Sequence, residues 1–161
     1  MAIRAKSLGA VLGAACALAL GVSGTANAAS FTWQDYTRDS TWNCGPAGST
    51  VQVGNLYVLP CIKISYGDWQ PVLMVTALSS GGNIVDYQTA LAFNSGGSSP
   101  LSSADCTDQN GDANAYIPPH TTLACFSPTK YTPNTLVEGE FGVEVGSTYK
   151  DLYSPGAWTT S

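Results

Sequence analysis

The stretch that decides the fold is Thr-Leu-Val-Glu-Gly-Glu-Phe-Gly-Val-Glu-Val, residues 135–145. Its apolar and acidic side chains alternate: one parity holds Val137, Phe141, Val143 and Val145, and the other holds Glu138, Glu140 and Glu144. Successive side chains of a strand point to opposite faces. The alternation therefore predicts a strand with one face in a core and the other against water or a partner.

Strand signals continue on both sides of this stretch. Short apolar alternations lie at 51–58, 61–66, 84–93 and 121–126. The run 72–78 is apolar on both parities, which predicts a central strand buried on both sides. Because no helical period follows the first 28 residues, these strands predict an all-β domain, a small β-sandwich or alternatively a β-barrel.

Turn chemistry predicts how two pairs of strands are connected. Residues 79–83, Ser-Ser-Gly-Gly-Asn, are expected to join 72–78 to 84–93 as a hairpin. The stretch 94–104 is rich in Gly and Ser and contains one Pro, which favours a flexible surface loop.

The first 28 residues have the pattern of an export signal. Arg4 and Lys6 precede an apolar run at 8–21, and small residues then lead to Ala26-Asn27-Ala28. The apolar run is shorter than the roughly 20 residues that cross a bilayer, and Ala-x-Ala suits signal peptidase. We therefore predict cleavage after Ala28 and a secreted, extracellular chain, long enough for one domain.

The mature chain is acidic. Four Lys and Arg remain after cleavage against eleven Asp and Glu, so the net charge is −7. This charge repels nucleic acid and anionic membrane surfaces. Neither is expected as a partner once the signal is removed.

Four cysteines remain in the mature chain: Cys44, Cys61, Cys106 and Cys125. An even number in a short exported chain predicts two disulfides, for which three connectivities exist. Pairing Cys44 with Cys61 and Cys106 with Cys125 is favoured, because each pair brackets one plausible strand-turn-strand unit. A zinc site would need closer cysteine pairs and more histidines.

Catalytic signals are weak in this sequence. His120 is its only histidine, it follows two prolines, and no Gly-x-Ser-x-Gly motif accompanies it. Paired carboxylates could hydrolyse sugars, but the glutamates of 138–144 are what a solvated strand face produces by default. We expect no enzymatic activity, no catalytic residue and no cofactor.

A weak calcium candidate lies at Asp108, Asn110 and Asp112, where oxygen ligands occupy alternate positions. The EF-hand rule then fails, because Ala113 stands where its glycine belongs and Pro119 where its glutamate belongs. A polar turn is therefore favoured, and no metal is predicted.

Residues 29–43, here called the N-terminal arm, are rich in aromatic side chains and hold no aliphatic side chain larger than alanine. We predict an extended arm that docks in a partner's groove or adds a strand to its sheet. Its predicted contact residues are Phe31, Trp33, Tyr36, Arg38 and Trp42. The alternative is a disordered leader without function. The predicted organisation is thus a signal peptide at 1–28, the arm at 29–43 and a β-sandwich domain at 44–161.

This layout of export signal, N-terminal extension and compact disulfide-bearing β-domain resembles the adaptor (B) subunit of the secreted umbrella toxin particles of filamentous Gram-positive bacteria. The resemblance implies that the arm, Phe31 to Trp42, inserts in the cleft of a lectin subunit with a degenerate trypsin-like fold. It also implies that the β-domain grips the repeat-built stalk of a large toxin polypeptide.

The expected function is therefore that of a non-catalytic adaptor that joins other extracellular proteins. One alternative is a carbohydrate-binding module, in which Trp33, Trp42 and Trp158 stack on sugar rings while Trp69 is buried. Another is a secreted inhibitor of proteases or other hydrolases, which would need a rigid exposed loop.

Overall fold

The computed structural model describes residues 29–45, 49–95 and 97–161. The described residues form an all-β structure without a helix, so none of them belongs to a helix that could span a bilayer. The predicted signal peptide lies outside the described residues. The strands are β1 Ala29–Thr32, β2 Trp42–Cys44, β3 Val51–Val53, β4 Leu56–Ser65, β5 Asp68–Ala77, β6 Gly82–Asn94, β7 Gly97–Thr107, β8 Ala115–Ile117, β9 Thr121–Phe126, β10 Lys130–Tyr131, β11 Leu136–Val145, β12 Thr148–Tyr153 and β13 Ala157–Trp158.

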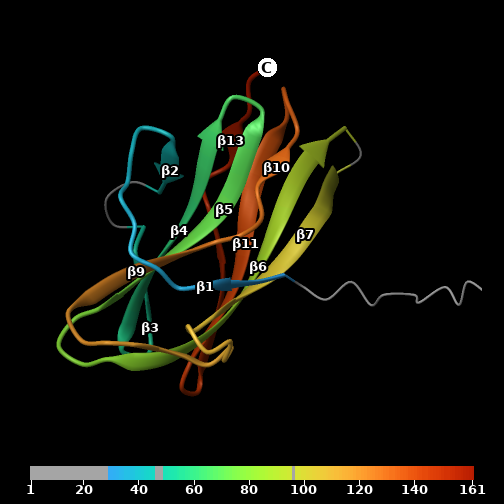
Figure 1. Ribbon diagram of the computed structural model, residues 1–161. Helices are drawn as coiled ribbons and strands as arrows, with labels where there is room; N and C mark the ends of the chain where they lie inside the picture. Colours follow the sequence, from blue (N-terminus) through green and yellow to red (C-terminus); the bar gives the residue numbers. More distant parts are fainter. Residues whose placement is uncertain (1–28, 46–48, 96) are drawn as a thin grey trace, which may run out of the picture.

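The strands form two sheets that pack face to face (Figure 1). Sheet A has the order β1-β7-β6-β11-β12, with β13 also paired to β11 and β8 to β6. Sheet B has the order β10-β5-β4-β2, with β3 also paired to β4 and β9 to β5. The two sheets do not close into one, which confirms the β-sandwich and excludes the barrel.

The core lies between the sheets and is built from the alternate side chains of each long strand that point toward the other sheet. The apolar parity of 135–145 is buried as predicted, with Phe141 and Val143 fully enclosed. From sheet B, Leu56 and Val58 of β4 and Leu73 of β5 belong to the same cluster. Side chains from two inner faces thus interdigitate, as sandwiches require.

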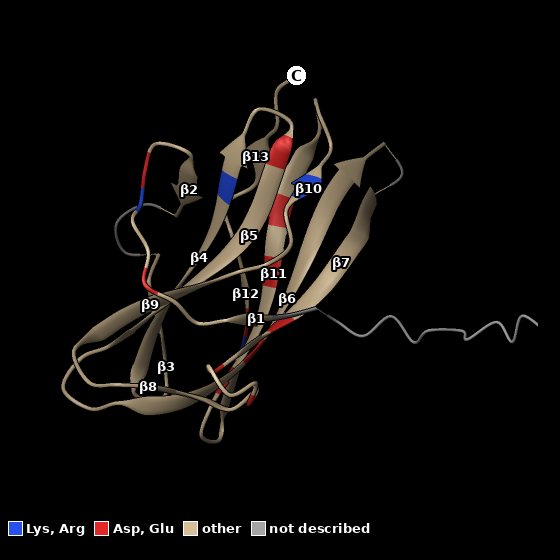
Figure 2. Cartoon of the chain, in the orientation of Figure 1, with Lys and Arg blue, Asp and Glu red and all other residues tan. Residues whose placement is uncertain are grey.

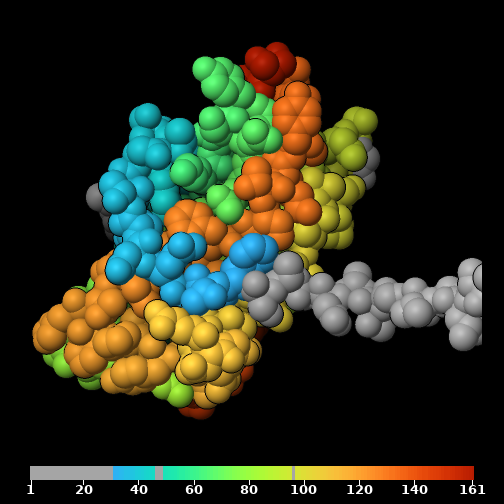
Figure 3. Space-filling model, in the orientation of Figure 1, coloured from blue at the N-terminus to red at the C-terminus, as the bar shows by residue number. Residues whose placement is uncertain are grey.

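Strand β5 is buried on both faces over 72–75, as predicted, whereas Leu78 of the predicted run lies beyond the strand and is 53% exposed. Its odd positions face sheet A, whereas Val72 and Met74 face away from it and belong to a second cluster with Trp42. The N-terminal arm therefore covers the outer face of sheet B. Figure 3 shows the start of the described chain lying along the body of the molecule.

Two predicted connections are wrong. Strands β5 and β6 belong to different sheets, so residues 78–81 cross between the sheets and do not close a hairpin. The predicted loop 94–104 is largely strand, because β7 pairs with β6 from Asn94↔Gly97 onward. Main-chain hydrogen bonds hold this ladder, and they form with Gly and Ser as well as with larger residues.

Both disulfides pair as favoured, and they differ in what they join. Cys44–Cys61 links directly paired residues of β2 and β4 within sheet B. Cys106–Cys125 links β7 of sheet A to β9 of sheet B, with both cysteines buried in the core. The second bridge therefore fastens the two sheets together.

Candidate protein-binding surface

The face of sheet A that points away from the core, here called the outer face, carries the acidic parity of β11. Residues opposite each other in an antiparallel pair share a face. Glu144 is paired with Val85 of β6 and with Tyr149 of β12. Glu140 is paired with Thr89 and with Tyr153. The pairing of β11 with the edge strand β12 therefore places the side chains of Glu144 and Glu140 next to those of Tyr149 and Tyr153 on the same face.

Large aromatic side chains stand exposed on this outer face. Their exposed fractions are 49% for Tyr87, 59% for Tyr149, 53% for Tyr153 and 67% for Trp158. Trp158 is paired with Leu136, and Leu136 with Phe93 on the next strand, so one end of the face is apolar. The outer face thus has three parts: exposed aromatic side chains, an apolar end at Trp158 and a row of glutamates along β11.

Two tyrosines are held in place by neighbouring carboxylates. The hydroxyl of Tyr149 donates to Oδ1 of Asp151 at 2.6 Å, and that of Tyr153 donates to Oε1 of Glu140 at 3.1 Å. A Cβ at Gly142 would stand 2.6 Å from the Tyr149 hydroxyl, so the absence of a side chain there lets that ring lie across the sheet. These hydrogen bonds raise the pKa of both phenols, which keeps them protonated.

Glu138 lies where the row of glutamates on β11 meets the apolar end of the outer face. Its partial burial raises the pKa of its carboxyl, and the charge of Glu140 raises it further. A cation placed here would relieve that repulsion, because an opposite charge favours the ionised form.

The basic residues of the described chain point elsewhere. Lys63 and Lys130 belong to sheet B, and Arg38 belongs to the arm. Lys150 is paired with the buried Val143, so its side chain leaves β12 on the inner side. Figure 2 shows red segments along β11, with blue segments on β4, near β10 and in the arm. Across the described residues, the outer face is therefore purely acidic.

The N-terminal arm is extended but packed on its own domain. Trp33 and Trp42 are 5% and 9% exposed, and Phe31 and Tyr36 are half-buried. The Trp42 ring lies 5.4 Å from that of Tyr36 and meets Phe126 edge-on. Partner contacts through either tryptophan would require the arm to leave the core.

The arm bridges both sheets through its backbone. Strand β1 runs parallel to β7, and the Trp33 N–H donates to the Thr107 carbonyl at 3.1 Å. One residue later, Gln34 exchanges two main-chain hydrogen bonds with Ala124 of β9. Arg38 remains exposed, beside an ion pair of 3.8 Å between Asp39 and Lys63. Of the five predicted contact residues, Arg38 alone is fully available at the surface.

The candidate calcium residues form a self-contained turn. The Asp108 carboxylate accepts the N–H groups of Asn110 and Asp112 at 2.7 and 2.9 Å, and Asp112 in turn accepts the N–H of Asn114. The bonds to Asp108 lower the pKa of its carboxyl. Within the described ranges, no three His, Cys, Asp or Glu side chains gather as metal ligands. His120 lies in a turn, with its side chain exposed.

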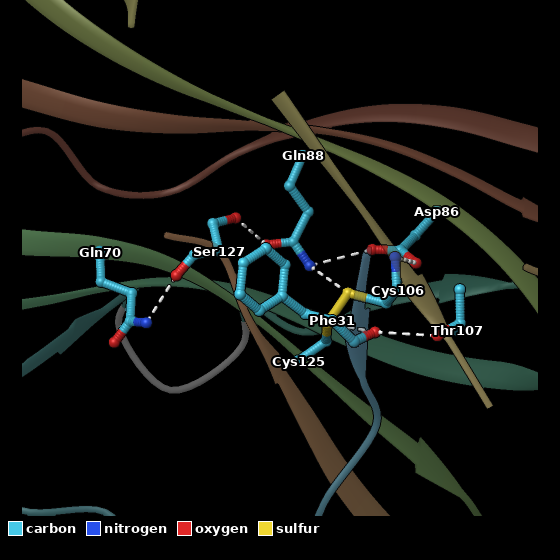
Figure 4. The surroundings of a disulfide bond; sticks show 8 residues. All are labelled: Phe31, Gln70, Asp86, Gln88, Cys106, Thr107, Cys125 and Ser127. Atoms are coloured by element: carbon cyan, nitrogen blue, oxygen red, sulfur yellow. Dashed lines mark hydrogen bonds between the residues drawn. A yellow bond between two sulfur atoms is a disulfide. The ribbon is translucent and has the colours of Figure 1, made fainter. Parts of the chain in front are cut away.

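A buried polar network surrounds the inter-sheet disulfide (Figure 4). Nε2 of Gln88 donates to Oδ2 of Asp86 and lies 2.9 Å from Sγ of Cys106, while Oε1 of Gln88 accepts the Ser127 hydroxyl at 2.6 Å. The Cys106 N–H donates to Oδ1 of Asp86. Burial raises the pKa of Asp86 to about 7 against these hydrogen bonds, which favour the ionised form.

No protein-family model matches this chain, and no curated protein does. The sequence shows the row of glutamates on β11 and marks Trp158 as a candidate for sugar stacking, whereas Tyr87, Tyr149 and Tyr153 were not singled out. The alternation Tyr149-x-Asp151-x-Tyr153 was a usable signal for a strand with one aromatic and acidic face. That this strand lies beside β11 depends on which strands pair and in which register, and the sequence alone does not determine either.

Proposed function

We propose that the mature chain is a secreted, non-catalytic binding protein that joins other extracellular proteins and docks one of them on the outer face of sheet A. The observation that carries the proposal is the set of exposed Tyr87, Tyr149, Tyr153 and Trp158 among carboxylates on one unpartnered sheet face. Exposed Tyr and Trp are enriched where proteins bind one another. The two disulfides are compatible with the extracellular location.

The chemistry of the face selects a cationic protein surface as its partner. Arginine stacks on tyrosine rings and pairs with carboxylates in fixed geometry. Glu140 and Glu144 lie beside Tyr153 and Tyr149, so a guanidinium can meet a ring and a carboxylate together. The net negative charge would also speed encounter with such a partner at low salt.

The specific form of this proposal is an adaptor between two subunits, as the resemblance to the umbrella toxin adaptor suggests. An adaptor needs a second contact region. The arm packs on sheet B through Tyr36 and Trp42, on the opposite layer from the outer face, and it carries the exposed Arg38. A lectin subunit and a toxin polypeptide are the partners that the resemblance implies.

The test starts with affinity purification of the tagged mature protein from culture supernatant, followed by mass spectrometry and measurement of Kd for the recovered partner. We expect Tyr149→Ser to weaken binding about tenfold, equivalent to about 1.4 kcal/mol. Glu144→Gln should weaken it less, and its effect should shrink as salt rises. Both side chains are exposed, so neither change removes core packing.

Matched controls lie on sheet B. Tyr131→Ser and Asp68→Asn alter an exposed tyrosine and an exposed carboxylate of that sheet and should leave Kd unchanged. Equal losses in both pairs of variants, or repeated recovery of the protein alone, contradict the proposal. Binding to insoluble polysaccharide that disappears in Trp158→Ala would instead establish a carbohydrate-binding module.

A further inference from the structure

Strand β12 lies at one edge of sheet A and pairs with β11 on one side only. Its six residues follow β11 without a register shift. Just beyond the strand and in the same register, the N–H of Ser154 donates to the carbonyl of Gly139 on β11 at 2.9 Å. Even-numbered residues of β12 therefore direct their main-chain groups to β11. Because this direction alternates along an antiparallel strand, Tyr149, Asp151 and Tyr153 direct theirs outward.

The other sheet edges in the described chain are short, interrupted or covered. Strands β1, β2, β3, β8, β10 and β13 have four residues or fewer. Strand β9 has six, but its Ala124 exchanges two main-chain hydrogen bonds with Gln34 of the arm. Strand β7 is paired with β1 at one end, and the rest of its edge contains Pro100 and a register shift opposite Ala90 and Leu91. Among the edges that the structure describes, β12 keeps the longest uninterrupted row of free main-chain donors and acceptors, and such an edge accepts a further strand.

The side chains of β12 place opposite charges on the two sides of this edge. On the outer face, Asp151 accepts the Tyr149 hydroxyl through Oδ1, and its Oδ2 accepts no hydrogen bond from the described residues. On the inner side, Lys150 is exposed and forms no ion pair with a described residue. A strand added along β12 therefore meets a carboxylate flanked by tyrosines on one side and an ammonium group on the other.

A second copy of this chain fits the edge poorly. Antiparallel pairing of two copies about a two-fold axis places residues of the same face opposite each other. The two central registers set either Lys150 opposite Lys150 or Asp151 opposite Asp151. Like charges directly opposite each other destabilise a pair of strands. The edge therefore favours a strand from a different protein.

We propose that β12 binds an extended segment of the partner as a further antiparallel strand of sheet A. The segment carries basic residues on the side that faces Asp151 and an acidic residue opposite Lys150, because opposite charges stabilise paired strands. Main-chain hydrogen bonds to Tyr149, Asp151 and Tyr153 give affinity, and the side chains give selectivity. This mode of binding rests on the proposed function, since it specifies how a cationic partner engages the rim of the outer face.

The test uses the ¹⁵N-labelled mature protein with both disulfides intact. The probe is the peptide Thr-Arg-Val-Arg-Glu-Arg-Thr with blocked ends, whose central arginine lies opposite Asp151 when its glutamate lies opposite Lys150. We expect saturable shifts of the amide signals of Tyr149, Asp151 and Tyr153. The Kd should be about tenfold lower than that of the charge-swapped peptide Thr-Glu-Val-Glu-Lys-Glu-Thr, equivalent to about 1.4 kcal/mol.

Two methylated forms of the peptide isolate the main-chain contacts. N-methylation of the central arginine removes a donor that faces β12 and should raise Kd about tenfold. N-methylation of the glutamate adds the same bulk, but its N–H points to solvent, so Kd should not change. On the protein side, Asp151→Asn should weaken binding severalfold, whereas Asp68→Asn on sheet B should leave it unchanged.

The outcomes separate strand addition from the proposed function. Equal effects of the two methyl groups, with shifts centred on β6 and β11, would exclude strand addition and still leave a cationic partner for the outer face. Equal affinity for the charge-swapped peptide would contradict both. The absence of any saturable shift would exclude strand addition alone, because the recovered partner and Tyr149→Ser test the outer face separately.

Discussion

The Cys106→Ala/Cys125→Ala double variant is expected to lose about 3 to 5 kcal/mol of unfolding free energy. The bridge spans 19 residues, and closing a loop of that size contributes about 3 kcal/mol in the chain-entropy model. Both cysteines are fully buried between the sheets, so their loss also disturbs the core and leaves the Gln88 amide beside a smaller side chain. The free energy is measured by urea unfolding at pH 6, followed through tryptophan fluorescence.

Cys44→Ala/Cys61→Ala provides the comparison. Its loop is nearly as long, with a separation of 17, so the entropy model alone predicts almost the same loss. This bridge, however, joins a three-residue edge strand to its neighbour within one sheet. Strand β2 can fray without separating the sheets, so we expect about 2 kcal/mol for this variant. A loss equal to or larger than that of the inter-sheet variant would contradict this account.

The sequence predicts strands far better here than it predicts connections. The alternation at 135–145 located β11 and its buried face, because a two-residue period is local information. The path from β5 to β6 was mispredicted because Gly- and Ser-rich turns serve hairpins and sheet-to-sheet crossings equally well. Strand β7 was missed because its first half offers main-chain hydrogen bonds but little β propensity.

The arm illustrates a different limit. Its aromatic residues and lack of aliphatic ones predicted an extended segment, and the segment is extended, yet its contacts are with β7, β9 and the outer side of β5. A clue was present in the run 72–78, which is apolar on both parities. An apolar second face on that strand requires another segment to bury it, and the N-terminal arm does so through Trp42. Sequence spacing cannot show which distant segment provides the cover.

Asp86 is the group for which we expect the clearest pH dependence. It occupies an inward position of β6, where Gln88, the Cys106 N–H and the nearby Asp105 are the polar and charged groups that act on it. Burial raises its pKa from 3.8 to about 7, and the charge of Asp105 adds to the shift. In the unfolded chain the same carboxyl returns to its ordinary value.

The sign of the effect follows from these two values. Between pH 4 and 7 the unfolded chain has lost a proton that the folded protein still holds. Stability therefore falls as pH rises through this window and then levels off above the folded pKa. The total loss of unfolding free energy is on the order of 4 kcal/mol, or about 1.4 kcal/mol for each of the roughly three pH units between the unfolded and folded pKa values.

Asp86→Asn should remove this dependence, because the amide is neutral throughout. Rotation of the Gln88 amide would let its oxygen accept from Asn at position 86 and its nitrogen donate to the Ser127 hydroxyl, so the network remains satisfied. We expect the unfolding free energy of the variant to exceed that of the wild-type protein by on the order of 4 kcal/mol at pH 8 and to match it near pH 4. Urea unfolding of both proteins at each pH from 4 to 8 gives the difference in unfolding free energy, which cancels the contribution of every other carboxylate.

The exposed Asp68→Asn serves as control and should follow the wild-type curve. Parallel curves for Asp86→Asn and wild type would mean that Asp86 is ionised in the folded state, with its hydrogen bonds from Gln88 and Cys106 outweighing its burial.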